Sequence, residues 1–181
     1  MWGTAAVVIL GFVGALYVVE GVDQVLGNRL DGFGVIPREA YGFDGILFAP
    51  LLHAGWWHLF GNTVPLLVLG YLILLSGVAR WAAVTTVVWL VAGLGTWLTG
   101  APGSIHLGAS VLVFGWLVYL ILRGFFTRRV GQVLVGLAVL VLYGGLLWGV
   151  LPTQVGVSWQ GHLFGAIGGV LAARGFANRD L

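Results

Sequence analysis

The sequence predicts an all-α membrane protein whose chain crosses the bilayer six times. Of its 181 residues, 60% are hydrophobic and only 8% are charged, whereas about a quarter of the residues in a soluble domain are charged. A membrane-spanning helix needs about 20 mostly apolar residues, and six segments meet this requirement: 2–20, 56–77, 80–99, 109–126, 130–151 and 161–177. Residues 1–181 are therefore expected to form one transmembrane domain.

The first apolar segment is interpreted as a retained helix rather than a signal peptide. It begins "MWGTAAVV" without a basic residue, and no small-x-small cleavage site follows it. The loop after it, residues 21–55, is the one long connection, and its mixture of turn residues and aromatics predicts that it lies partly in the membrane interface. The chain has no cysteine, which excludes disulfides and thiolate chemistry.

The arginines predict the orientation of the spans. All eight basic residues are arginine, and only Arg29 and Arg38 fall in the first loop, beside four carboxylates. The even-numbered loops and the C-terminus hold the other six, which the positive-inside rule places in the cytoplasm together with both termini. These six are Arg80, Arg123, Arg128, Arg129, Arg174 and Arg179.

Polar residues that are costly near lipid gather at one end of three predicted helices. His58 and Asn62 begin the second segment, Ser110 begins the fourth, and His162 begins the sixth. Ser110 and His162 precede the arginines at the ends of their segments by roughly 20 Å and 18 Å of helix. In a core about 30 Å thick, both then lie roughly 10 Å below the outer surface. Irregular backbone at that depth requires a covered or hydrated pocket, so the sequence predicts a pocket open to the outside.

The pocket contains the side chains that serine hydrolysis needs. A serine requires a nearby base, and His162 suits neutral pH. With no carboxylate near the sixth segment, the sequence predicts a Ser110–His162 dyad in which helix packing holds the imidazole. His58, Asn62 and the backbone N–H of Ser110 are candidate oxyanion donors. Singly, each residue could be a helix cap or an interhelical hydrogen bond, and it is their coincidence that favours catalysis.

Two other chemistries fit the sequence less well. Zinc hydrolases use H-E-x-x-H on one helix face, whereas His53 and His58 are five apart without a nearby carboxylate. A transporter or channel would place charged groups in the middle of its spans, and here they lie in loops and at span ends. We therefore expect no metal, no cofactor and no nucleic-acid partner. His106, in a loop expected to be exposed, is assigned no role.

Three motifs in this order resemble those of rhomboid intramembrane serine proteases. "HAGWWHLFGN" matches the pattern H-x4-H-x3-N of the second helix, "GAS" matches most of G-x-S-G at the fourth, and "GHLFGAIGG" matches the sixth-helix histidine and its glycines. The resemblance covers nearly the whole chain. The matching positions are His53, His58, Asn62, Gly108, Ser110, His162, Gly165 and Gly169.

The resemblance implies both a fold and an activity. The fold is the bacterial six-helix rhomboid bundle, in the inner membrane with its site open to the outside. Ser110 is implied as the nucleophile and His162 as the base, with Phe114 against its ring and His53 as support. The implied activity is cleavage of transmembrane or membrane-proximal segments of other membrane proteins, which enter past the fifth helix. The alternative is an impaired rhomboid-like protein that binds membrane clients without cleaving them.

The sequence departs from the family pattern at two places. Asp44 and Gly45 stand where many members carry Trp-Arg in the first loop, which concerns the anchoring of that loop. Val111 replaces the glycine after the serine, at the tight contact of the fourth and sixth helices. We expect its branched side chain to spread these helices partly and to weaken the Ser110–His162 hydrogen bond, which predicts a slow protease.

Overall fold

The computed structural model describes residues 2–153 and 156–177, and over these residues the regular elements are all helical. The long helices are α1 (Trp2–Val25), α3 (Trp56–Leu74), α4 (Val78–Thr99), α5 (Ser110–Thr127), α6 (Val130–Tyr143) and α7 (Trp159–Gly175). The short elements are the helix α2 (Gly45–Phe48) and the 3₁₀ helices η1 (Leu30–Phe33), η2 (Ala40–Gly42), η3 (Ala49–Leu51) and η4 (Gly144–Val150).

Each of the six predicted segments coincides with a long helix, with some boundaries shifted. α1 continues to Val25 because the polar residues after position 20 extend the helix, with Gln24 Nε2 donating to Glu20 Oε1 at 2.8 Å. α3 ends earlier, at Leu74, because Gly77 takes a positive φ of 112° before α4. The predicted fifth span is α-helical to Tyr143 and 3₁₀ from there to Val150.

The helices make the chain an integral membrane protein. Among the described residues, five segments are long and apolar enough to cross a bilayer, namely residues 2–25, 56–74, 78–99, 110–127 and 130–150. The sixth predicted span, α7, has 17 residues and is about 26 Å long at 1.5 Å per residue. It packs mainly against α4 and α5, so much of its surface contacts protein rather than lipid.

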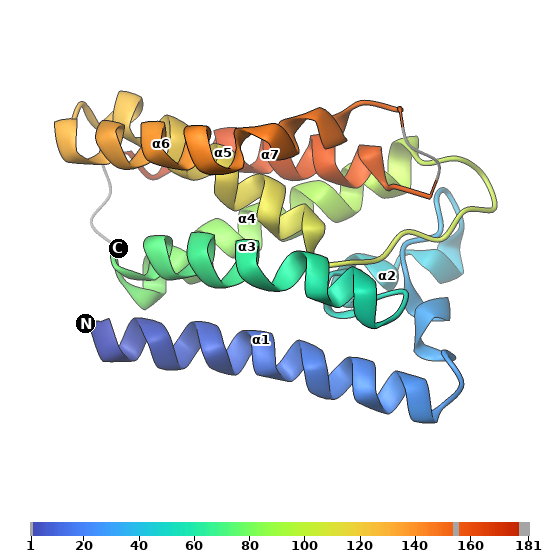
Figure 1. Cartoon of the computed structure of the whole chain (residues 1–181). Coiled ribbons are helices and arrows are strands. Elements are labelled where there is room, and N and C mark those ends of the chain that lie inside the picture. Colours follow the sequence, from blue (N-terminus) through green and yellow to red (C-terminus); the bar gives the residue numbers. More distant parts are fainter. Residues whose placement is uncertain (1, 154–155, 178–181) are drawn as a thin grey trace.

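The two ends of the bundle hold different parts of the chain (Figure 1). The start of α1, the end of α3, the end of α5 and the end of α7 lie at one end, and the long first loop lies at the other. Arg80 at the start of α4 donates from Nη1 to the carbonyl of Phe176, just after α7, at 2.8 Å. Successive long helices therefore run in opposite directions through the bundle, as the six-span prediction requires. Arg179, one of the arginines used for the orientation, lies outside the described residues.

Glycines bring the backbones of α5 and α7 into direct contact. A Cβ on Gly169 would collide with the carbonyl oxygen of Gly115, and one on Gly165 would collide with the carbonyl oxygen of Val111. In the other direction, a Cβ on Gly115 would lie 2.9 Å from the Gly165 carbonyl oxygen. Small residues at such a crossing let two membrane helices approach more closely than any side chain would permit. The separation of α5 and α7 is therefore set by main-chain contact.

The first loop is a structured arm docked on α4 and on the segment before α5. Val35 and His106 exchange two backbone hydrogen bonds of 2.8 and 2.9 Å. The Arg38 guanidinium donates to the carbonyls of Leu98 at 3.2 Å and Gly100 at 2.9 Å, where a cation also favours the negative end of the α4 dipole. The predicted loop is thus held by polar contacts with the bundle.

Gly45, one of the two departures from the family pattern, has a structural reason within this arm. The main chain of Gly34 passes directly against it, and a Cβ at position 45 would collide with the Gly34 carbonyl. A larger residue here would push apart the two segments of the arm that contain Gly34 and Gly45. The glycine therefore permits close backbone packing within the arm.

The glycine contact predicts a selective loss of stability. Gly169→Ala places a methyl group against the Gly115 carbonyl, and such overpacking typically costs 1–3 kcal/mol. Gly14→Ala in α1 is the matched control, because nothing lies within 4 Å of its added Cβ. Thermal unfolding in detergent, followed by tryptophan fluorescence, should show a lower Tm for Gly169→Ala alone. Equal Tm values for both variants would contradict the main-chain contact.

Candidate active site

Ser110 and His162 form a hydrogen-bonded pair at the starts of α5 and α7. The distance from Ser110 Oγ to His162 Nε2 is 2.9 Å, and His162 Nδ1 lies 2.9 Å from the carbonyl oxygen of Gly149. A carbonyl oxygen can only accept, so Nδ1 carries the proton and Nε2 is the acceptor. The Ser110 hydroxyl therefore donates to an imidazole in the tautomer that a general base requires.

The orientation of the His162 ring is fixed by a carbonyl and an aromatic ring. Phe114, one turn after Ser110, stacks on the imidazole with ring centroids 4.0 Å apart and an interplanar angle of 8°. Gly149 in η4 supplies the hydrogen-bond acceptor, and a Cβ on it would lie 2.8 Å from Phe114 Cζ. The sequence predicted helix packing as the support of this imidazole and missed the Gly149 carbonyl, which no side-chain pattern could reveal.

His58 faces the same point as the Ser110 hydroxyl. Gly108 has a φ of +125°, and a Cβ built on it would lie 2.7 Å from His58 Nε2 and 3.6 Å from Ser110 Oγ. On the other side of the ring, the backbone N–H of Ala54 donates to His58 Nδ1 at 3.4 Å. Nδ1 is thus an acceptor, so Nε2 carries the proton and points a donor into the site. Gly108 leaves the space in which that donor sits.

His53 lies in the loop before α3, as predicted, and supports the segment before Ser110. The backbone N–H of Ala109 donates to His53 Nε2 at 3.3 Å, and the His53 and His58 rings meet edge to face at 5.1 Å. The side chain is 1% exposed. Burial, with a smaller contribution from His58, lowers the pKa of His53 to about 3. His53 therefore remains a neutral acceptor at physiological pH.

Asn62 lies one turn after His58 on α3 and is 7% exposed. Its Nδ2 donates to the His58 carbonyl oxygen at 3.1 Å, so one of its two N–H groups is used within the helix. His58 and Asn62 share a helix face, as the spacing of four residues predicted. Only His58 reaches the immediate surroundings of Ser110 through the described contacts.

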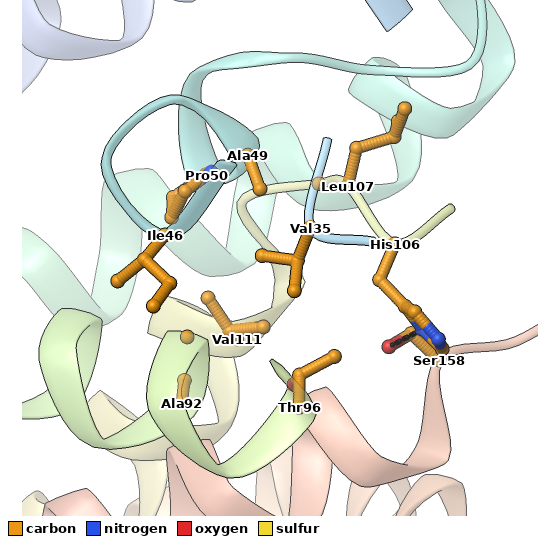
Figure 2. Close-up of a pocket in the computed structure, with 12 residues that line it drawn as sticks. Val35, Ile46, Ala49, Pro50, Ala92, Thr96, His106, Leu107, Val111 and Ser158 are labelled. Atoms are coloured by element: carbon orange, nitrogen blue, oxygen red, sulfur yellow. Dashed lines mark hydrogen bonds between the residues drawn. The ribbon is translucent and has the colours of Figure 1, made fainter. Parts of the chain in front are cut away.

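Val111 is accommodated, and the expected weakening of the dyad bond is wrong. Its Cγ1 is only 3.0 Å from the position that a Cβ on Gly161 would occupy, so the glycine of α7 leaves the space that the isopropyl group fills. The Ser110–His162 distance remains 2.9 Å. Val111 also borders a cavity of about 20 Å³ between the first loop, α4 and the segment before α5 (Figure 2).

His106 differs from its prediction as an exposed loop residue without a role. Both of its ring nitrogens make hydrogen bonds, Nε2 with Ser104 Oγ at 2.8 Å and Nδ1 with Ser158 Oγ at 2.7 Å. Partial burial lowers the pKa of this imidazole. The sequence did contain a signal for this pair. His106 lies four residues before Ser110, and Ser158 lies four residues before His162. Over residues 2–153 and 156–177, no group of three or more histidine and carboxylate side chains is arranged to hold a metal ion.

Comparison with known proteins establishes the family. A family model described as Rhomboid domain matches residues 40–179. The chain belongs to the rhomboid family. The matched region begins in the first loop and contains the rhomboid motifs of α3, α5 and α7, whereas α1 precedes it.

Relatives of this rhomboid chain occur in mycobacteria and in Bacillus. Uncharacterized proteins of Mycobacterium tuberculosis and Mycobacterium leprae are each 49% identical to it over 180 residues. These alignments cover 95% of this chain, 75% of the M. tuberculosis protein and 71% of the M. leprae protein. A Bacillus subtilis protein named "Putative rhomboid protease YdcA" is 30% identical over 123 residues, covering 67% of this chain and 61% of the relative.

The packing of Val111 predicts the effect of restoring the glycine of the family motif. Val111→Gly removes a side chain that fills the space over Gly161, next to an existing cavity. The larger void and the more flexible helix should lower Tm, with a cost of about 2 kcal/mol. Because the dyad bond is already short, the rate of fluorophosphonate labelling should not rise. A faster labelling rate in Val111→Gly would show that the valine strains the dyad in solution.

Proposed function

We propose that the protein is an intramembrane serine endopeptidase with a Ser110–His162 dyad. The observation that carries this proposal is the 2.9 Å hydrogen bond between Ser110 Oγ and His162 Nε2, on an imidazole whose other nitrogen donates to the Gly149 carbonyl. Membership of the rhomboid family supports the same activity. The name of the Bacillus subtilis relative points in the same direction.

In the proposed mechanism, His162 takes the proton of Ser110 as Oγ attacks the carbonyl carbon of the scissile peptide bond. The resulting imidazolium is stabilised by its Nδ1–H bond to the Gly149 carbonyl, in the position that a carboxylate occupies in a triad. His162 then gives the proton to the leaving amine, which leaves an acyl ester on Ser110. Water, activated by His162, hydrolyses that ester and restores the free serine.

The oxyanion of the tetrahedral intermediate requires donors that are already in place. The N–H of Ser110 is one of the first N–H groups of α5, which have no acceptor inside the helix. His58 Nε2–H borders the same space. Asn62, bonded to the His58 carbonyl, is assigned a smaller part, as a second donor or as a support for the position of His58.

The proposed substrates are transmembrane or membrane-proximal segments of other membrane proteins. A helical segment keeps its carbonyls hydrogen-bonded, so small or helix-weakening residues are expected near the cleavage site. We place the chain in the bacterial inner membrane with both termini in the cytoplasm, because arginines lie at the start of α4 and at the ends of α5 and α7, on the side of the bundle where α1 begins. The dyad then opens to the outside, and the substrate enters past α6.

The dyad is tested by removing each partner. Ser110→Ala and His162→Ala should each lower the turnover of a model transmembrane substrate in detergent by about 1,000-fold or more, and the double variant should be no worse than either. Fluorophosphonate should label the native protein at Ser110, as mapped by mass spectrometry, and should not label Ser110→Ala. Ser76→Ala, at the opposite end of the bundle, is the matched control and should retain both activities.

The outcomes separate protease from client-binding protein. Near-normal turnover in Ser110→Ala or His162→Ala would refute the dyad. A native protein that neither cleaves nor is labelled, but still binds transmembrane segments, would favour the impaired rhomboid-like alternative.

The oxyanion donors predict a different kinetic signature. His58→Ala should lower kcat by about 100- to 1,000-fold with little change in KM, because a donor to the oxyanion acts in the transition state. Asn62→Ala should lower kcat less, since one of its N–H groups bonds to the His58 carbonyl. An effect on KM alone would indicate substrate docking instead.

Activity should also survive EDTA, and its loss would favour a metal-dependent reaction.

A further inference from the structure

A second hydroxyl–imidazole pair lies beside the dyad, between the segment before α5 and the first residues of α7. The distance from His106 Nδ1 to Ser158 Oγ is 2.7 Å, shorter than the 2.9 Å of the Ser110–His162 bond. Figure 2 shows this bond at the edge of the small cavity that Val111 and Thr96 also line. In the dyad the serine belongs to α5 and the histidine to α7. In this second pair the histidine precedes α5 and the serine precedes α7.

The hydrogen bonds around this pair define its donor and acceptor. Ser104 uses its hydroxyl hydrogen to donate to the Ala101 carbonyl at 2.6 Å. Its oxygen, 2.8 Å from His106 Nε2, must then accept, so Nε2 carries the ring proton. His106 Nδ1 is therefore an acceptor, and the Ser158 hydroxyl donates to it. The chain of bonds ends in a backbone carbonyl and leaves neither ring nitrogen unpaired.

Each member of the pair lies one helical turn before a residue of the dyad. His106 precedes Ser110 by four residues, and Ser158 precedes His162 by four. Ser158 is the N-cap residue of α7, and its carbonyl accepts the backbone N–H of His162 at 3.1 Å. Whatever holds Ser158 therefore holds the turn of helix that carries the base.

The other side of the pair is anchored in the docked first loop. His106 exchanges two backbone hydrogen bonds with Val35, which fixes its main chain to that arm. Its ring is enclosed closely, since a Cβ on Gly100 would lie 2.9 Å from Nε2. A Cβ on Gly161 would similarly lie 2.9 Å from Ser158 Oγ. Side chains at Gly100 and Gly161 would occupy the space that the His106 ring and the Ser158 hydroxyl now fill.

We propose that His106 and Ser158 are positioning residues that fasten the start of α7 to the segment before α5. The inference rests on the proposed function, since its purpose is to hold His162 at hydrogen-bonding distance from Ser110. The two residues act through the first turn of α7 and donate nothing to the reacting atoms. The glycine contacts of α5 and α7 set the separation of the helix axes, and the His106–Ser158 bond fixes the end that carries the dyad.

The kinetic test compares variants that remove or keep the bond. Ser158→Ala and His106→Leu should each lower kcat and the rate of fluorophosphonate labelling by about 10- to 100-fold with KM unchanged, because a displacement of about 1 Å costs up to about 100-fold. Ser158→Thr, which keeps the hydroxyl, and His106→Asn, which keeps an acceptor near the position of Nδ1, should restore most of the rate. The double variant should be no slower than either single variant. Thr153→Ala, on the same connecting loop, is the control.

A second measurement does not depend on catalysis. Hydrogen exchange of peptides that cover residues 157–166, in detergent, should be faster in Ser158→Ala and His106→Leu than in the native protein or in Thr153→Ala. Protection of α5 should remain unchanged. If exchange accelerates but the native protein is never labelled at Ser110, the proposed function fails while the fastening role stands.

Three results would overturn the positioning role. The first is unchanged exchange and unchanged rates in both bond-removing variants. The second is an equal loss of rate in Ser158→Thr and Ser158→Ala, which would show that the hydroxyl is irrelevant. The third is a change in KM alone, which would assign the pair to substrate docking.

Discussion

The close contact between the main chains of α5 and α7 is the constraint on which the rest of the site depends. Gly115, Gly165 and Gly169 place carbonyl oxygens of one helix where side chains of the other would otherwise stand. At this separation, residues at the starts of the two helices can share a hydrogen bond without long side chains. Serine is short, and its pairing with His162 at 2.9 Å is possible because the two helices are already close.

Around this contact, three of the four histidines make a hydrogen bond with a backbone group, and that bond decides which ring nitrogen carries the proton. His53 accepts from the Ala109 N–H, His58 accepts from the Ala54 N–H, and His162 donates to the Gly149 carbonyl. The main chain thus selects a different tautomer for His162 than for His58. One imidazole consequently presents an acceptor and another presents a donor to the space around Ser110, although the two side chains are chemically identical.

Much of the fold and of the site could be predicted from the sequence, because both follow from side-chain type and spacing. Apolar segments of membrane length identified the helices, and the costly polar residues Ser110, His58 and His162 are ones that the fold brings together. Contacts made by the main chain left no comparable signal. The carbonyl of Gly149 could not be recognised as the support of His162, since any residue has a carbonyl. Val111 was misjudged for a related reason, because the room over Gly161 depends on the angle at which α5 and α7 cross.

The position of Gly149 has a consequence for how His162 is supported. The residue belongs to η4, the segment that continues α6 toward the loop before α7, and α6 packs on α5 with few buried residues of its own. Of the contacts that hold the His162 ring, the bond to Gly149 comes from η4, whereas the Phe114 stack and the Ser110 bond come from α5. The tautomer of His162 is therefore set by a backbone carbonyl in the least buried of the five described segments that are long enough to cross a membrane.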